Sequence, residues 1–281
     1  MEQLSAAGWV GQASGQVQEL TGLDPATVEQ LASVHDPRYV QALQRLAAQN
    51  KTQFLDGDTY ATGASFDAAS RAAGIGIGLA DAIGRAFRAG REAPPVGFAL
   101  CRPPGHHAIP RGPMGFCLMS TVAITARHIQ SMGYRRVLIF DFDVHHGNGT
   151  QVRIGGPTHP GATGISHDGL SFASRAQDAF WEDPDVLFIS THQANSYPGT
   201  GKMGEVGAGA GEGATINVVL PADSGDAAAR AALEEVVGPA ADRFRPDFIL
   251  VRYKSRLPYP PPRELPPALN LFAVLIVQCW L

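Results

Sequence analysis

The stretch VLIFDFDVHHGNGTQ, residues 137–151, decides the fold class of this chain. Its first six residues form a largely apolar run, typical of strands that are buried on both faces of a parallel sheet. Where the run ends, Asp141, Asp143 and His145 alternate along the backbone, so their side chains point to the same side. Sites in open α/β sheets lie beyond the carboxyl ends of the strands. The stretch therefore predicts a parallel sheet with a site at its edge.

The rest of the chain repeats this pattern of buried strands and helices. Apolar runs predict further strands at residues 96–100, 186–190 and 248–251, and periodic apolar positions predict helices at residues 66–88, 121–132 and 227–244. Strands that alternate with helices indicate an α/β fold with a doubly wound parallel sheet. Gly74, Gly76 and Gly78 lie inside a predicted helix and lack a preceding strand. They are better explained by close helix packing than by a dinucleotide-binding loop.

Composition excludes several classes of function. The 281 residues are 44% hydrophobic and 17% charged with a net charge of -4, and Lys and Arg are scattered, so we expect no nucleic-acid surface. The three cysteines form no Cys-x-x-Cys pair, which favours a reducing compartment. The start shows no signal peptide, and the apolar residues 269–281 are too few for a spanning helix, so we expect no membrane contact. An intracellular protein, in the nucleus or cytoplasm, is the expectation, with an organelle as the alternative.

The residues at the predicted sheet edge favour a metal site with paired histidines. Two carboxylates and an imidazole at the end of an apolar strand are costly unless a cation neutralises them, and this mixture suits Zn²⁺. The loop RPPGHH, residues 102–107, follows another strand and brings His106 and His107 to the same edge. Histidine titrates near neutral pH, so the pair can share acid and base duties. The alternative is a hydrogen-bonded polar cluster without metal.

Several long motifs together resemble the histone deacetylase family, nearer to its class II and plant or bacterial members than to class I. They are residues 34–40 (VHDPRYV), 55–60 (LDGDTY), 102–107 (RPPGHH), 115–117 (GFC), 141–151 and 178–201. The resemblance implies the arginase/deacetylase α/β sandwich. It also implies hydrolysis of an N-acetyl amide, on an acetylated lysine protein or a small molecule, with co-repressor-type proteins as further partners.

The resemblance also implies roles for individual residues. It makes Asp143 and His145 zinc ligands, and His106 and His107 the general acid/base pair, oriented by Asp141 and Asn148 respectively. Phe116 and Gly115 would line the acyl-lysine tunnel, and Asp58 would hold the substrate backbone at its rim. The residues that would frame a structural potassium ion are Asp141, Asp143, His145, Ser190 and Thr191.

The chain departs from the family pattern in three places. The opening strand and its His-Pro-Glu stretch are absent, and residues 152–177 interrupt a run that is continuous in relatives. After residue 251 the family has Ser-Ala-Gly-x-Asp, whose Asp is the third zinc ligand, whereas this chain places Arg256 in that register and has no Asp after Asp247. The later Gly-Gly-Tyr, whose tyrosine would stabilise the oxyanion, also has no counterpart.

These departures predict a deacetylase-like domain over residues 1–251, interrupted by an unrelated insert at 152–177 and followed by a divergent Pro-rich tail at 252–281. The C-terminal part of the fold would be incomplete, and insert and tail would be poorly packed. Both begin at Val-Arg, which fits translation of retained introns. Zinc binding would be weakened or absent and catalysis impaired. Two alternatives remain: a non-catalytic module that binds acyl-lysine or a partner, and an arginase-type ureohydrolase with two manganese ions.

Overall fold

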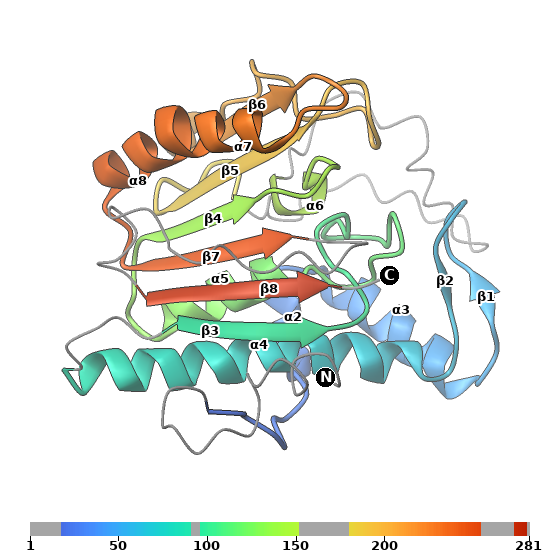
Figure 1. The fold of residues 1–281 in the computed structure, drawn as a ribbon. Coiled ribbons are helices and arrows are strands. Elements are labelled where there is room, and N and C mark those ends of the chain that lie inside the picture. The colour runs from blue at the N-terminus through green and yellow to red at the C-terminus, as the bar shows by residue number, and fades with distance from the viewer. Residues whose placement is uncertain (1–17, 91–95, 152–179, 254–272, 280–281) are drawn as a thin grey trace, which may run out of the picture.

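The computed structural model describes residues 18–90, 96–151, 180–253 and 273–279 (Figure 1). Its centre is a parallel sheet of six strands in the order β3-β8-β7-β4-β5-β6. The strands are β3 (Val96–Cys101), β4 (Val137–Asp141), β5 (Val186–Gln193), β6 (Thr215–Leu220), β7 (Phe248–Tyr253) and β8 (Ala273–Cys279). The parallel α/β class predicted from the sequence is confirmed.

Helices cover both faces of this sheet, giving three layers (Figure 1). On one face pack α2 (Val28–Ala32), α3 (Pro37–Ala48), α4 (Ser65–Arg88) and α5 (Thr121–Ser131). On the other face lie α7 (Asp226–Ala232), a π-helical turn (Leu233–Val237) and α8 (Gly238–Phe244). Among the described residues, no helix combines the length and the apolar character needed to cross a bilayer.

The burial of both faces of strand β4 explains why residues 137–140 are all apolar. Val137 and Ile139 belong to the core beneath α4 and α5, whereas Leu138 and Phe140 belong to the core beneath α8. All four side chains are buried, the most exposed being Phe140 at 7%. Alternate residues of the strand thus fill two different cores, and its carboxyl end is held rigidly between them.

Two strands of the six-stranded sheet were not predicted. Strand β6 was missed, and the expectation that the tail lacks regular structure is wrong for β8, which pairs with β3 on one side and β7 on the other. The tail contains the apolar run AVLIV at residues 273–277, which has the length and composition of a buried strand. The insert at 152–177 and residues 254–272 lie outside the described residues, so their predicted poor packing stays a prediction.

Smaller elements complete the fold. The hairpin of β1 (Gln53–Phe54) and β2 (Tyr60–Ala61) encloses the predicted rim residue Asp58. Short helices occur at α6 (Asn148–Gln151) and η1 (Gly209–Gly211). The predicted helix at 227–244 is regular except for the π-helical turn between α7 and α8.

Close helix packing at the glycines of α4 is confirmed. A Cβ on Gly74 would overlap the backbone carbonyl of Asp24, and a Cβ on Gly76 would overlap the hydroxyl of Thr125 on α5. At Gly78 the nearest atom would be a methyl carbon of Leu23, 2.8 Å away. The first obstacle is backbone, whereas the last is the end of a flexible side chain.

We therefore expect Gly74→Ala to lower the free energy of unfolding by about 2 kcal/mol, because the Asp24 backbone must move and overpacking of this kind costs about 1–3 kcal/mol. Gly78→Ala should be close to neutral, because Leu23 can change rotamer and alanine gains about 1 kcal/mol in helix propensity. Urea unfolding of the two variants measures the difference. Equal stabilities would contradict the packing described here.

Candidate active site

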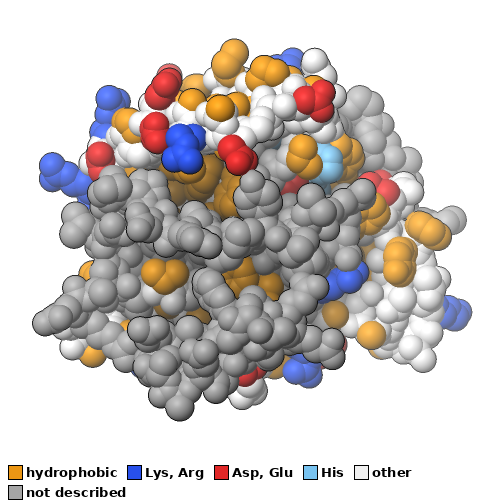
Figure 2. Space-filling view, in the orientation of Figure 1, with side chains coloured by type: hydrophobic (Ala, Val, Ile, Leu, Met, Phe, Trp, Pro, Cys, Tyr) orange, Lys and Arg blue, Asp and Glu red, His pale blue; other side chains and the backbone are white. Residues whose placement is uncertain are grey.

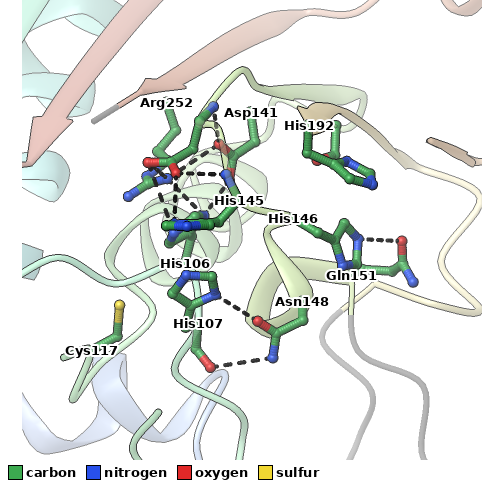
Figure 3. Close-up of polar contacts among 12 residues, drawn as sticks. His106, His107, Cys117, Asp141, His145, His146, Asn148, Gln151, His192 and Arg252 are labelled. Carbon is green, nitrogen blue, oxygen red and sulfur yellow. Dashed lines mark hydrogen bonds and ion pairs between the residues drawn. The ribbon is translucent and has the colours of Figure 1, made fainter. Parts of the chain in front are cut away.

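The predicted site residues meet at the carboxyl edge of the sheet (Figure 3). The loop after β3 carries His106 and His107, and the end of β4 carries Asp141. The ring centroids of His106 and His107 are 3.8 Å apart, and that of His145 lies 5.9 Å from His107. The predicted clustering is confirmed, whereas the individual roles of these residues remain predictions.

His106 is held by a buried carboxylate. Its Nδ1 lies 2.9 Å from Oδ2 of Asp141, and neither side chain is more than 1% exposed. The other carboxylate oxygen of Asp141 accepts a hydrogen bond from the backbone N–H of Asp143 at 3.1 Å. Asp141 therefore fixes both the histidine and the turn that leads to Asp143.

His107 is held by an amide instead. Its Nδ1 lies 2.7 Å from Oδ1 of Asn148, which can only accept, so the Nδ1 atom carries the hydrogen and Nε2 keeps a lone pair. The amide nitrogen of Asn148 faces Sδ of Met114 at 3.3 Å, which is consistent with this orientation. Burial, followed by the charge of His106, lowers the pKa of His107 well below 6.5. His107 is therefore neutral near pH 7 and can accept a proton at Nε2.

The two predicted zinc ligands are neighbours. Oδ1 of Asp143 accepts the backbone N–H of His145 at 2.9 Å and lies 3.5 Å from Nδ1 of its ring. Asp143 is buried, whereas the His145 side chain is 32% exposed. Of the two predicted ligands, only His145 is accessible to solvent to a substantial extent.

Arg252 on β7 enters the site between these groups, which the sequence analysis did not foresee. Its Nη1 lies 2.8 Å from Oδ2 of Asp143, 3.3 Å from Oδ1 of Asp141 and 2.7 Å from Nδ1 of His106 (Figure 3). Burial alone would raise the pKa of Asp143, but the charges of Arg252 and His106 outweigh it and hold that pKa below 3.8. The Asp143 carboxylate is therefore ionised and already paired with a cation.

The donor set does not fit a catalytic zinc ion, which takes three protein ligands and keeps one open position. Within the described part of the chain, no three His, Cys, Asp or Glu side chains are arranged to hold a metal ion. The guanidinium of Arg252 lies against Asp143, where a metal would bind. Arg256, which the sequence register places at the third ligand position, lies outside the described residues.

The residues predicted to frame potassium share this edge. Asp141 pairs in register with Ser190 on the neighbouring strand β5, and Thr191 follows it. The hydroxyl of Ser190 contacts Nδ1 of His192 at 3.0 Å. The potassium site remains a prediction.

One aromatic residue, Tyr197, and one glycine, Gly115, lie beside His107. Gly115 has a φ of +54°, and a Cβ there would come within 2.6 Å of the His107 ring and 3.1 Å of the Tyr197 ring. Tyr197 packs edge-on to His107 at 4.9 Å between ring centroids. Phe116 is 44% exposed. Gly115 thus lies at the site with Phe116 next to it in the sequence, their role in a tunnel remains a prediction, and Tyr197 adds a wall that the sequence analysis passed over within residues 178–201.

The predicted rim residue Asp58 is tied to this wall through Thr59. The Thr59 hydroxyl donates to Oδ1 of Asp58 at 2.9 Å and accepts the backbone N–H of Phe116 at 2.9 Å. Phe116 has a φ of 66°, a conformation that is rare for non-glycine residues. The bond from Thr59 helps to hold Phe116 in this conformation.

A second polar network lies beneath the site and was also missed. His146 contacts the side chains of Thr200 at 2.8 Å and Gln151 at 2.9 Å, and Asn217 donates to Gln151 at 2.8 Å. The segment 199–213 is anchored at Gly201, which is buried and accepts a hydrogen bond from His192. The adjacent histidines at 145 and 146 were the available signal.

The described surface carries no long basic run on the face drawn in Figure 2, where the visible Lys and Arg side chains are separated by acidic and uncharged ones.

A three-layer α/β fold with buried His–Asp and His–Asn pairs at the carboxyl edge of its sheet defines the class of deacetylase-domain proteins. The chain belongs to the histone deacetylase family, since the family model "Histone deacetylase domain" matches residues 2–155 and 175–253. It is 47% identical over 242 residues to "Histone deacetylase 14, chloroplastic" of Arabidopsis thaliana, covering 84% of this chain and 51% of the relative. It is 35% identical over 226 residues to a "Probable deacetylase" of Archaeoglobus fulgidus, covering 80% of this chain and 54% of the relative.

A solved structure supports the same fold. The crystal structure of the HDA15 HD domain superposes with a TM-score of 0.75 at 30% identity, covering 99% of this chain and 73% of that chain. The present chain spans about half the length of the curated relatives described above. The family match leaves out residues 156–174, within the predicted insert, and the proposed domain boundaries stay predictions.

Proposed function

We propose that this chain recognises N-acyl-lysine with the site of a histone deacetylase and that, with Arg252 in place, it hydrolyses the amide poorly. The observation that supports the proposal is that one part of the site is assembled and another part is not. His107, Asn148 and the Gly115–Phe116 wall are assembled, whereas Asp143 is paired with a guanidinium. The residues for ligand recognition and for proton transfer are thus in place. The metal ion that would polarise the amide carbonyl has no suitable set of ligands.

Recognition would use the walls beside His107. Tyr197 and Phe116 offer aromatic surface to the aliphatic part of an acylated lysine, and Gly115 leaves room between them and His107. The carboxylate of Asp58 at the rim would accept backbone N–H groups of a bound peptide. A neutral acyl-lysine suits an apolar channel better than a charged lysine does, because burial of an unpaired ammonium is costly.

Proton transfer would be the work of the histidines. Asn148 fixes Nδ1–H of His107, which leaves Nε2 to accept a proton from a water molecule or return it to a leaving amine. Asp141 would orient His106 in the same way. The family is zinc-dependent, but the donors present here do not fit that ion, and its contribution is left out of this account.

Partners and location follow the family only as proposals. Acetylated proteins or small N-acetyl amides are the proposed ligands, with co-repressor-type proteins as additional partners and potassium as a structural ion. The names of two plant relatives, from Arabidopsis thaliana and Oryza sativa subsp. japonica, contain the word chloroplastic, which supports the organelle alternative. The ureohydrolase alternative is not proposed, because the chain belongs to the deacetylase family.

The test is binding of a fluorescent acetyl-lysine peptide, with the unmodified peptide as reference. We expect the acetylated peptide to bind more tightly, and Gly115→Ala to weaken that binding at least about tenfold, since a new Cβ would overlap His107 and strain a positive φ. Gly112→Ala is the matched control in the same loop, because its Cβ would lie 3.8 Å from Ile109 in ordinary contact. Equal affinity for both peptides would refute the proposal.

A further inference from the structure

We infer that Arg252 is a built-in cation that takes the place of a metal ion in this site, so that the chain keeps its buried carboxylates neutralised without bound metal. This inference goes beyond the proposed recognition of acyl-lysine and does not depend on it.

The charges at the edge of the sheet require a cation. Asp141 and Asp143 are 0% and 2% exposed, and two ionised carboxylates this deeply buried are stable only when they are paired. Arg252, itself 1% exposed, supplies the charge from within the same chain. A single nitrogen atom, Nη1, lies within 3.3 Å of an oxygen of each carboxylate.

The placement of Arg252 follows from the backbone and not only from a side-chain rotamer. Residue 252 pairs in register with Asp141 on the adjacent parallel strand. Any long cationic side chain that points toward the site from this position reaches the carboxylates. In the family pattern this position holds serine, whose side chain is too short and carries no charge.

Binding of a metal by Asp143 and binding of Arg252 are mutually exclusive. A divalent ion on Oδ2 of Asp143 would have to displace Nη1, which is 2.8 Å away, or sit beside a second positive charge. Arginine does not deprotonate in proteins, so it cannot yield by losing its charge. The guanidinium therefore competes with metal at every accessible pH.

Arg252 also alters His106. A guanidinium nitrogen has no lone pair, so the 2.7 Å contact between Nη1 and Nδ1 of His106 is a hydrogen bond only if Nδ1 accepts. Asp141 at 2.9 Å from the same atom favours a hydrogen there. The two neighbours compete for one ring nitrogen, and removal of Arg252 should return His106 to the tautomer that Asp141 favours.

The experiment measures metal content and melting temperature of the full chain produced in zinc-supplemented medium. We expect far less than one zinc per chain by elemental analysis, and the same melting temperature with EDTA and with added Zn²⁺. One tightly held zinc per chain, whose removal by EDTA lowers the melting temperature, would overturn the inference without any variant being needed.

A variant gives the converse test. Arg252→Met removes the charge at similar volume and should lower the melting temperature by on the order of 10 °C without metal, because one partner of a buried ion pair is lost. Added Zn²⁺ should restore part of that loss. Arg135→Met, in an exposed pair with Asp185, is the matched control and should shift melting by no more than about 2 °C.

The melting temperatures test the built-in cation, and peptide binding tests the proposed function. Arg252→Met that melts with the wild type, or that responds to Zn²⁺ no more than the wild type does, would refute the built-in cation. Acetyl-lysine peptide binding, measured on the same samples without metal, reports on the proposed function independently.

Discussion

Addition of an acetyl-lysine peptide to the purified 281-residue chain should give a rate at least about 10³-fold below that of a deacetylase with a complete site, even with zinc present. Two absences act together. The sequence contains no Asp after Asp247 to serve as third metal ligand, and no counterpart of the Gly-Gly-Tyr donor, a type of loss worth about 10²- to 10³-fold by itself. In addition, the guanidinium of Arg252 is paired with the carboxylate of Asp143 and competes with a metal ion for it.

The internal comparison is His107→Ala. General acid–base catalysis contributes about 10²- to 10⁴-fold when the rest of a site works, so removal of His107 should be conspicuous in an active enzyme. Here we expect wild type and His107→Ala to have indistinguishable rates, because proton transfer has no activated carbonyl or water to serve. Release of acetate, measured by a coupled assay, distinguishes the two cases. Ordinary turnover that His107→Ala abolishes would show that the site is complete by a route not described here.

Acid should destabilise the folded chain between pH 6.5 and pH 4 through His35. This side chain is 1% exposed, its Nδ1 donates to the carbonyl of Ile109 at 3.1 Å and its Nε2 accepts the backbone N–H of Ser120 at 2.8 Å. Burial lowers the pKa of His35 from 6.5 to about 4. A second proton on the ring would place two donors against each other at Ser120.

The direction in which pH changes the free energy of unfolding depends on which state, folded or unfolded, binds more protons. As the pH falls below 6.5, the unfolded chain protonates His35 while the folded chain does not, so acid favours unfolding. The stability is fully present above pH 6.5 and is lost progressively down to about pH 4. Each pH unit changes the free energy of unfolding by about 1.4 kcal/mol per proton, so this interval of roughly 2.5 units gives about 3 kcal/mol.

Urea unfolding at pH 7, 5.5 and 4.5 measures this slope. His35→Gln has no proton to gain in this range and should be less stable than the wild type at pH 7. The slope of its free energy of unfolding against pH should be smaller than that of the wild type by the contribution of about one proton. His128→Gln removes a partly exposed histidine beside Asp81 and leaves His35 intact, so it is the matched control for the loss of a histidine. Identical slopes for wild type and His35→Gln would rule out His35 as the source.

The sequence was sufficient to predict the parts of the fold that depend on local pattern. The run at residues 137–142 predicts β4, because a strand that is buried on both faces is apolar at nearly every position. The segments that follow β3 and β4 predict which side chains meet, since parallel strands end at the same edge. The pairs His106–Asp141 and His107–Asn148 then required the family resemblance to be assigned.

The parts that were missed depend on distant contacts. Arg252 was read as the first residue of a divergent tail, and only the register of β7 against β4 places it opposite Asp141. Strand β8 was overlooked because the Pro-rich stretch that precedes it in the sequence suggested a different kind of segment. Tyr197 reaches His107 through a long connection that no periodicity in the sequence indicates.

The position of β8 has a consequence for the order of assembly during translation. β8 is synthesised after the five other strands of this sheet, yet its place is between β3 and β7. Until residues 273–279 have left the ribosome, β3 and β7 have no neighbour on the sides that face each other, and their backbone amides and carbonyls stay unpaired. In the nascent chain the position between β3 and β7 is therefore empty. The unpaired edges of these two strands can associate with other unfinished chains until residue 279 has been synthesised.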